Sequence, residues 1–240
     1  MSTPTPAGAP PLGTPRLHLR STDSTNARAR ALAIVGAPHG TLVTAAEQTA
    51  GRGRQGRTWS APPGRALLAS LVLREVPALL AAASALAVAD VAGRDATIKW
   101  PNDVLLGGRK VAGILAEGRA HEGWVVLGIG LNVAVRPRDL APDVAAHAAG
   151  LGLEPADVEP VLVALLAALA ARFAQQPDAI LAAYRERDAL VGHEVRWQHG
   201  SGVAAGVDGA GRLLVDRTDG DRIALEAGEV HLLRASAAGA

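Results

Sequence analysis

Arginine and glycine crowd together over one short stretch of the chain, Gly51 to Arg57, which ends two residues before Trp59. Three arginines and three glycines fall within these seven residues. Glycine allows positive φ angles and close approach of the backbone to a ligand, and arginine offers a planar fork of donors to a carboxylate or phosphate. The stretch follows residues 41–48, which read as a strand, and loops held by a rigid element often carry binding residues. The pattern predicts a loop that closes over an anionic ligand and is mobile without one.

A second cluster of chemical groups lies about fifty residues further on, between Lys99 and Lys110. Asn102 and Asp103 stand between the two lysines, and Gly107-Gly108 is typical of a tight hairpin turn. We expect residues 97–106 to form one strand that runs through Pro101, with residues 110–117 returning beside it. Lysine suits a phosphate, and a neighbouring carboxylate can hold Mg²⁺. The alternative is an ordinary surface hairpin with solvated lysines.

The remaining segments would position these two clusters. Ser24, Thr25 and Asn26 are typical helix N-cap residues, although a helix N-terminus is also a ready site for an anion. A third strand over 124–135 would complete an antiparallel meander with the hairpin. Further strands are expected at 17–19 and 66–74, and helices at 27–35, 76–92, 157–175 and 178–190.

The two ends of the chain differ from the middle. Residues 1–15 are rich in Pro, Thr and Ala and predict a disordered tail. From Gly192 onwards, short β-like runs are separated by Asp-Gly and Ala-Gly turns, which predicts a small all-β module at 192–240 that packs against a larger domain at 16–191. Residues 136–156 are expected to be loop with a short helix.

Composition excludes several classes of protein. The 240 residues carry 24 basic and 23 acidic side chains, a formal charge of +1 that does not favour a general nucleic-acid surface. With no cysteine there is no disulfide or thiolate nucleophile. We find neither a signal peptide nor a membrane-spanning apolar run, so we expect a cytoplasmic protein that does not bind membranes.

Three segments together, GRGRQGRTW, KWPNDV with KVAGIL, and GIGLNV, resemble biotin protein ligases (biotin–[acetyl-CoA-carboxylase] ligases) in order and spacing. The similarity extends from about residue 17 to the C-terminus, where GVDGAGRLLV and GEVHLLR resemble that family's last domain. It implies an α+β, class II synthetase-like catalytic domain of the biotin–lipoate ligase type, with a mixed, largely antiparallel sheet and flanking helices. The C-terminal module would be a small Src-homology-3-like β-barrel. The N-terminal tail is too short for the winged-helix DNA-binding domain of the bifunctional members, so we expect a ligase-only form that does not bind DNA.

The resemblance also implies a reaction and a set of residues. The biotin carboxylate would attack the α-phosphate of ATP to give biotinyl-5′-AMP and pyrophosphate, and a lysine of a carrier domain would then take the biotin. The residues implied as catalytic are Lys110, Arg54 and Arg52. The residues implied to bind biotin are Ser24, Thr25, Asn26, Gln48, Arg52, Arg54, Lys110, Gly113 and Leu115. The residues implied to bind ATP or the adenylate are Gly51, Gly53, Arg54, Arg57, Trp59, Asn102, Asp103 and Asn132. Trp59 would lie near the adenine, and Asp103 would hold Mg²⁺.

The sequence leaves two alternatives open. A lipoate– or octanoate–protein ligase shares the fold and the adenylation chemistry, but the loop and the C-terminal module argue against it. A non-enzymatic nucleic-acid-binding module could use the Arg/Gly loop, but the near-neutral chain argues against that. The implied partner is the biotin carboxyl carrier domain of acyl-CoA carboxylases, and the family includes monomers and homodimers.

Overall fold

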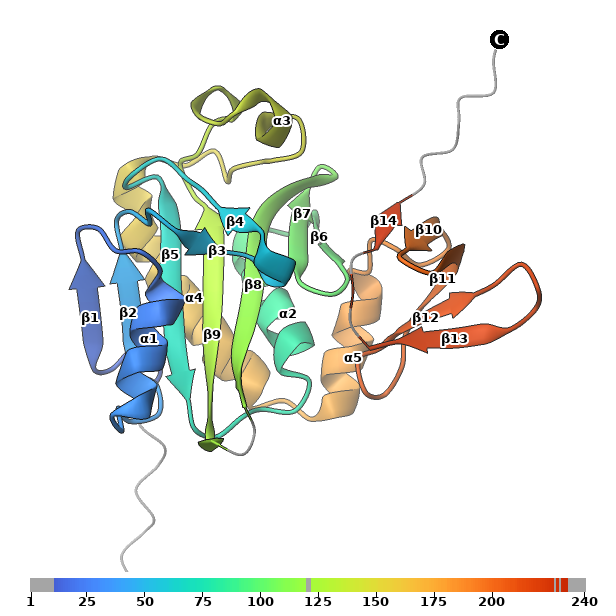
Figure 1. The fold of residues 1–240 in the computed structure, drawn as a ribbon, viewed down its shortest axis with the longest axis horizontal. Coiled ribbons are helices and arrows are strands. Elements are labelled where there is room, and N and C mark those ends of the chain that lie inside the picture. Colours follow the sequence, from blue (N-terminus) through green and yellow to red (C-terminus); the bar gives the residue numbers. More distant parts are fainter. Residues whose placement is uncertain (1–10, 120–121, 227, 229, 233–240) are drawn as a thin grey trace, which may run out of the picture.

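The computed structural model describes residues 11–119, 122–226, 228 and 230–232. Its centre is a seven-stranded sheet with the order β1-β2-β5-β9-β8-β7-β6 (Figure 1). The β1–β2 pair is parallel and every other neighbouring pair is antiparallel. The strands of this sheet are β1 (Arg16–Leu19), β2 (Leu42–Ala45), β5 (Ala66–Leu73), β6 (Ala96–Lys99), β7 (Asp103–Leu106), β8 (Arg109–Arg119) and β9 (Trp124–Asn132). The expected mixed, largely antiparallel α+β fold is confirmed.

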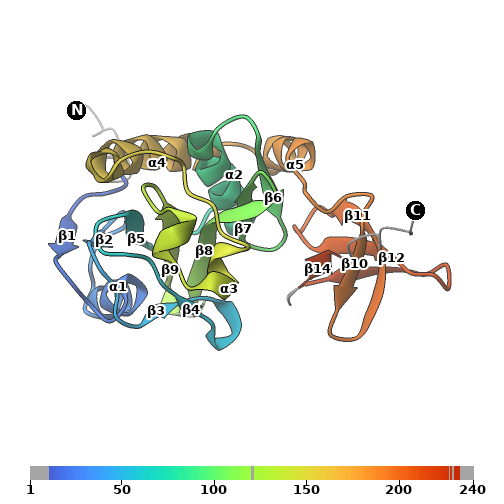
Figure 2. The same ribbon diagram turned by 90° about the horizontal axis from the view of Figure 1, so that it is seen from above.

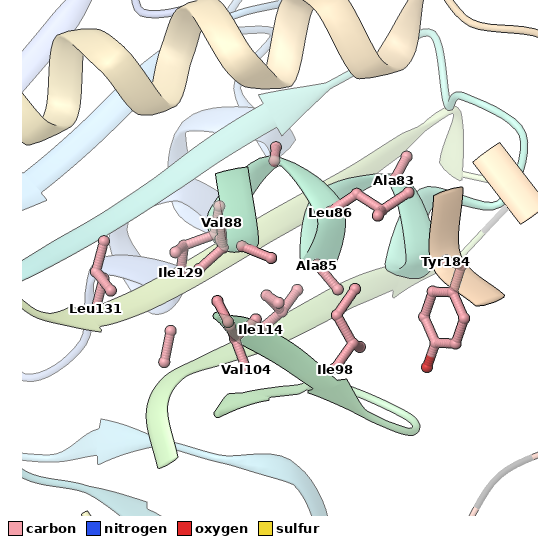
Figure 3. Packing of buried hydrophobic residues seen from close by; sticks show 14 of the residues in the cluster. Ala83, Ala85, Leu86, Val88, Ile98, Val104, Ile114, Ile129, Leu131 and Tyr184 are labelled. Carbon is pink, nitrogen blue, oxygen red and sulfur yellow. The ribbon is translucent and has the colours of Figure 1, made fainter. Parts of the chain in front are cut away.

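Helices cover both faces of this sheet. Helix α1 (Thr25–Ile34) packs on β2, β5 and β9, whereas α2 (Leu80–Ala92), α4 (Val158–Phe173) and α5 (Pro177–Glu186) lie on the opposite face (Figure 2). Leu86 and Val88 of α2 meet Ile98, Ile114 and Ile129 of the sheet in the main core (Figure 3). With few aromatic residues available, alanine lets α2 come close to the strands. The short α3 (Pro142–Ala145) belongs to the connection after β9.

The segment around Pro101 corrects one prediction. The expected single strand over 97–106 is two strands, β6 and β7, which pair with each other from Ala96↔Leu106 to Lys99↔Asp103. Proline has no N–H for a strand ladder, so the chain turns at Trp100-Pro101-Asn102, where the Trp100–Pro101 peptide bond is cis. The turn brings Lys99 and Asp103 directly opposite each other.

The hairpin predicted at Gly107-Gly108 is confirmed, and so is the meander of β7, β8 and β9. The pairing of β7 with β8 changes register between Val104↔Ala112 and Leu105↔Lys110, so that Val111 is an extra residue on β8. Such a bulge bends the strand and re-aims its side chains, and bulges recur next to active sites. This bulge lies beside Lys110.

Two further boundaries differ from expectation. Helix α2 begins at Leu80 and not at Val76, because Pro77 disfavours a helical Val76 and Leu79 has a left-handed φ of 52°. Residues 11–15 lie within the predicted tail, yet they contact the domain through a hydrogen bond from the Gly13 N–H to the Gly40 carbonyl (2.8 Å). The rest of that predicted tail, residues 1–10, lies outside the described residues.

A second, five-stranded sheet with the order β13-β12-β11-β10-β14 follows α5. Its strands are β10 (Glu194–Trp197), β11 (Gly200–Val207), β12 (Leu213–Asp216), β13 (Arg222–Leu225) and β14 (His231–Leu232), all paired antiparallel. Its buried Val195, Val207 and Leu213 belong to the same apolar cluster as the main core, so the two sheets are packed together. Among the described residues, no helix is both long and apolar enough to cross a lipid bilayer.

Candidate active site

A pocket of about 110 Å³ opens where α1, the Gly/Arg loop and strands β7 to β9 meet. It brings together most of the residues expected to bind biotin or nucleotide. Those that line it are Ser24, Thr25, Asn26, Gln48, Arg52, Gly53, Arg54, Arg57, Trp59, Asn102, Asp103, Lys110, Gly113 and Leu115. Residues widely separated in sequence therefore share one cavity.

The first turn of α1 forms one end of the pocket. Ser24 caps the helix by accepting from the Ala27 N–H (3.4 Å), which leaves the adjoining side chains to make contacts across the sheet. The Gln48 side-chain carbonyl accepts from both the backbone N–H (2.7 Å) and the hydroxyl (3.0 Å) of Thr25. Because its oxygen is used twice, Gln48 offers its NH₂ group as a donor to a ligand carbonyl.

Asn26 is held in a buried network at the same end. Its Oδ1 accepts from the Ser70 hydroxyl (2.6 Å), and its Nδ2 donates to Glu117 Oε2 (2.7 Å). The strand below leaves room for it, because a Cβ at Gly128 would lie 2.0 Å from Asn26 Oδ1. A buried amide with both ends bonded is fixed in orientation, so this end of the pocket is preorganised.

The Gly/Arg loop forms the outer wall. It is a small hairpin of β3 (Gly51–Arg52) and β4 (Thr58–Trp59), joined by a single 3-10 turn over Arg54–Gly56. Gln55 has a left-handed φ of 55° at its tip, a conformation that costs free energy in a residue other than glycine. Burial lowers the pKa of the Arg54 guanidinium, and Arg57 acts in the same direction while Asp103 opposes it. An arginine stays protonated under such a shift, so the wall is cationic.

Lys110 and Asp103 face each other on the floor of the pocket. Lys110 Nζ lies 2.6 Å from Asp103 Oδ1 and 5.7 Å from the centre of the Trp59 ring. The ring packs over two strands, because Cβ atoms at Gly113 and Gly130 would come within 3.2 and 2.5 Å of it. The bulge on β8 and these two glycines therefore make the space in which a lysine, a carboxylate and an indole meet.

Three of the expected residues lie differently from the rest. Gly51 lines a second hollow, between the loop and the end of β8. Asn102 lines the pocket, but its Nδ2 donates to the Ile114 carbonyl (3.0 Å) and ties the turn to β8. Asn132 lies outside the pocket lining, buried, and its Nδ2 donates to the Ala149 carbonyl (2.9 Å). The structure thus brings Asn132 to the connection after β9 and not into the cavity.

The structure also reveals pocket residues that sequence reasoning missed. Glycines on β9 form the floor, and residues after β13 reach in from the C-terminal sheet. The glycines of the GIGLNV segment were a signal for this, since glycine in a strand often marks a close approach of another group to the backbone. No local signal pointed to Ser70, which lies within a fully buried strand. The sequence had given no ligand-binding role to six residues that line the pocket, Lys99, Trp100, Gly128, Gly130, Gly228 and Val230. It had also given none to Ser70 and Glu117, which support the pocket from outside its lining through their bonds with Asn26.

Comparison with known proteins agrees with this geometry. The model of the Biotin/lipoate A/B protein ligase family matches residues 18–133. The chain is 39% identical to a biotin–[acetyl-CoA-carboxylase] ligase of Mycobacterium tuberculosis, over 89% of this chain and 87% of that protein. It is 37% identical to the Paracoccus denitrificans protein of the same name, over 88% and 98% respectively. The biotin protein ligase of Aquifex aeolicus, solved with biotin and ATP, superposes with a TM-score of 0.78 and 26% identity, covering 92% of this chain and 100% of that one.

Proposed function

We propose a residue-level mechanism from the premise that this chain belongs to the biotin/lipoate A/B protein ligase family and is an ATP-dependent biotin protein ligase. The observation that carries the mechanism is the pocket itself, where a cationic wall and Lys110 face a preorganised polar end. We assign the catalytic part to residues 16–191 and treat 192–240 as a smaller module packed on it. The Src-homology-3-like shape of that module remains a prediction.

Biotin would bind at the α1 end of the pocket. The Gln48 amide donates to the ureido carbonyl, while Asn26 and the α1 N-terminus supply the other polar contacts. Gly113 and Leu115 line the path of the aliphatic chain, which leads the carboxylate towards Lys110. This placement uses the hydrogen-bond directions already fixed by Thr25, Ser70 and Glu117.

The first half-reaction joins two anions and therefore needs cations. The carboxylate oxygen attacks the α-phosphorus, the bond to the β-phosphate bridging oxygen breaks, and pyrophosphate leaves with that electron pair. Arg52, Arg54 and Lys110 offset the repulsion of the reactants and stabilise charge that develops at phosphorus. No side chain acts as nucleophile, so positioning of the two substrates carries much of the rate.

The second half-reaction needs the same pocket closed to water. The amine of a carrier lysine attacks the activated carbonyl carbon, loses a proton and expels AMP. Before the carrier arrives, the Gly/Arg loop retains the mixed anhydride, with Trp59 as an apolar wall. The carrier we propose is the biotin carboxyl carrier domain of an acyl-CoA carboxylase, in keeping with the names of the relatives.

Magnesium would come with ATP. Mg²⁺ is commonly held by one or two protein carboxylates together with substrate phosphates. Among the described residues, no cluster of three His, Asp or Glu side chains could hold a metal by itself. Asp103 is the carboxylate in the pocket lining, so it fits a Mg²⁺ ion whose other ligands are mainly the phosphates of ATP.

The test is incubation with ATP, Mg²⁺ and biotin, followed by measurement of pyrophosphate and mass detection of biotinyl-5′-AMP. We expect release that depends on biotin. Lipoate and octanoate serve as matched acids, and release with either of them but not with biotin would contradict the proposed substrate.

A further inference from the structure

The side chain of Trp100 connects the pocket to the C-terminal sheet. Trp100 lies in the turn between β6 and β7, and the residue is 4% exposed. Its indole Nε1 donates to the backbone carbonyl of Gly211 at 3.0 Å. A buried indole N–H needs such an acceptor, because leaving it unpaired costs the desolvation of the donor. The contact therefore fixes the turn against the second sheet.

The same turn carries groups that face the pocket. Asn102 is tied to β8 by two bonds with Ile114, one from its side chain (3.0 Å) and one to its carbonyl (2.9 Å). The next residue, Asp103, pairs with Lys110. The turn is thus held at two points, by β8 through Asn102 and by Gly211 through Trp100, so loss of the second leaves Asn102 and Asp103 less firmly positioned.

The segment that presents the Gly211 carbonyl is a stiff turn over residues 208–212, here called the clamp turn. Asp208 Oδ1 accepts from the N–H groups of Ala210 and Arg212, both at 2.9 Å, and its Oδ2 accepts from Arg212 Nε at 2.7 Å. Gly211 has a φ of +77°, and a Cβ there would lie 3.3 Å from Leu79 Cδ2. Asp208 holds this geometry without lining the pocket.

We infer that Trp100 is a positioning residue for the ATP-dependent half-reaction and that the clamp turn holds it in place. The inference rests on the proposed function, since it assigns Asn102 and Asp103 to the nucleotide side. The polar contacts of the biotin end do not involve Trp100 or the clamp turn, because Thr25 of α1, Gln48 after β2 and Ser70 of β5 hold one another. Loosening the clamp turn therefore impairs the use of ATP and leaves biotin binding unchanged.

Two variants of the full chain test this. Trp100→Phe removes the indole N–H, and we expect kcat/KM for ATP to fall about fivefold to tenfold, the effect of one lost hydrogen bond. Because Trp100 also lines the pocket, Asp208→Ala is the sharper variant: it loosens the clamp turn and leaves every pocket residue unsubstituted. We expect a loss of about twofold to fivefold for Asp208→Ala, by the same reasoning. Biotin Kd should stay at the wild-type value in both.

The matched control is Asp219→Ala. Asp219 accepts from the Asp221 N–H (3.3 Å) and pairs with Arg217 (2.6 Å) in the turn between β12 and β13. That hairpin points away from the main sheet (Figure 1). Asp219→Ala therefore removes the same kind of turn contact without touching Trp100, and its kcat/KM for ATP should equal that of the wild type.

The outcomes separate the inference from the function on which it rests. A wild-type protein that releases no pyrophosphate with biotin overturns the proposed function. An active wild type with unchanged kcat/KM in Asp208→Ala overturns the inference, even if Trp100→Phe is impaired, because Trp100 would then act by direct contact. A parallel loss of biotin affinity in Asp208→Ala also overturns it. If Trp100→Phe does not fold, Asp208→Ala alone decides.

Discussion

At the scale of single residues, the pocket charges are arranged in opposed pairs. Lys110 lies against Asp103, and Arg52 lies 4.0 Å from Glu117. A phosphate would compete with these carboxylates for the same cations, so binding exchanges one charged partner for another. Breaking these ion pairs offsets part of the free energy gained when Lys110 and Arg52 bind an anion.

Lys110 is the residue whose loss should slow adenylation most. Lys110→Ala removes the cation nearest the expected site of attack and leaves Asp103 without its ion-pair partner. By analogy with loss of a transition-state donor, we expect kcat for pyrophosphate release to fall about 10²- to 10³-fold. The control is Arg109→Ala, which removes the same charge from the preceding, exposed position on β8. Near-normal pyrophosphate release by Lys110→Ala would contradict a catalytic role of Lys110 in adenylation.

Arg54 is expected to retain the adenylate and to contribute little to stability. It is a loop residue, and we expect Arg54→Ala to leave the thermal melt unchanged while biotinyl-5′-AMP leaves the enzyme about tenfold faster, as for one lost charge-assisted hydrogen bond. Rapid filtration followed by mass detection of the free adenylate measures this. Arg30→Ala is the control, because it removes the same charge from an exposed position on α1 and should leave the release of the adenylate unchanged. A large drop in melting temperature for Arg54→Ala would count against the assignment.

At the scale of elements, the position of α1 over β9 decides the shape of the biotin end of the pocket. Gly128 lies under Asn26, where a Cβ would be 2.0 Å from its Oδ1. Gly128→Ala should displace Asn26 and break its bonds to Ser70 and Glu117. Losing these two bonds should weaken biotin binding at least about tenfold.

Calorimetric titration with biotin tests this prediction, and ATP affinity in the same variant shows whether the effect is local. Gly209→Ala is the control, since a Cβ there would meet nothing within 4 Å. Wild-type biotin affinity in Gly128→Ala would show that Asn26 does not shape the site.

The elements also show what the sequence could and could not predict. Apolar periodicity and the Gly107-Gly108 turn were sufficient for the β7–β8–β9 meander, because those signals are local. The break at Pro101 was missed because the flanking residues have strand character on both sides, although a proline inside such a run is itself a local signal against a single strand. The bulge at Val111 depends on the register between strands, which a single segment does not encode. The contact between Trp100 and Gly211 spans 111 residues, and no local pattern predicts it.

At the scale of the whole molecule, the two sheets meet at a junction that contains a buried acid. The backbone of residues 187–189 bonds to Ile98 of β6, through the Arg187 carbonyl (2.7 Å) and the Ala189 N–H (2.9 Å). Asp188 lies between these bonds. Its Oδ1 accepts from the Leu190 N–H (2.8 Å), whereas its Oδ2 is buried without a partner among the described residues. The Tyr184 hydroxyl nearby is also buried and unpaired within that part of the chain, so it gives Asp188 Oδ2 no hydrogen bond.

This junction should make stability depend on pH. Burial raises the pKa of Asp188 above its ordinary value of 3.8, and the N–H groups of Leu190 and Val191 offset this only in part. An acid with a raised pKa in the folded state binds its proton more tightly when folded, so its ionisation destabilises the fold. That cost is absent below pH 3.8, grows as the pH rises towards the folded pKa, and is complete above it.

Asp188→Asn should remove this cost, because Asn carries no charge and its Oδ1 can still accept from the Leu190 N–H. We expect the variant to have a higher urea midpoint than the wild type at pH 8, and the difference to shrink as the pH is lowered towards 4. Asp178→Asn is the control for loss of an exposed carboxylate, since Asp178 lies in the first turn of α5, where an acid is favourable, and its loss should not raise the urea midpoint. A lower midpoint for Asp188→Asn at every pH would mean that the carboxylate accepts a stabilising hydrogen bond at Oδ2. The junction would then be held together by the charge of Asp188, and not weakened by it.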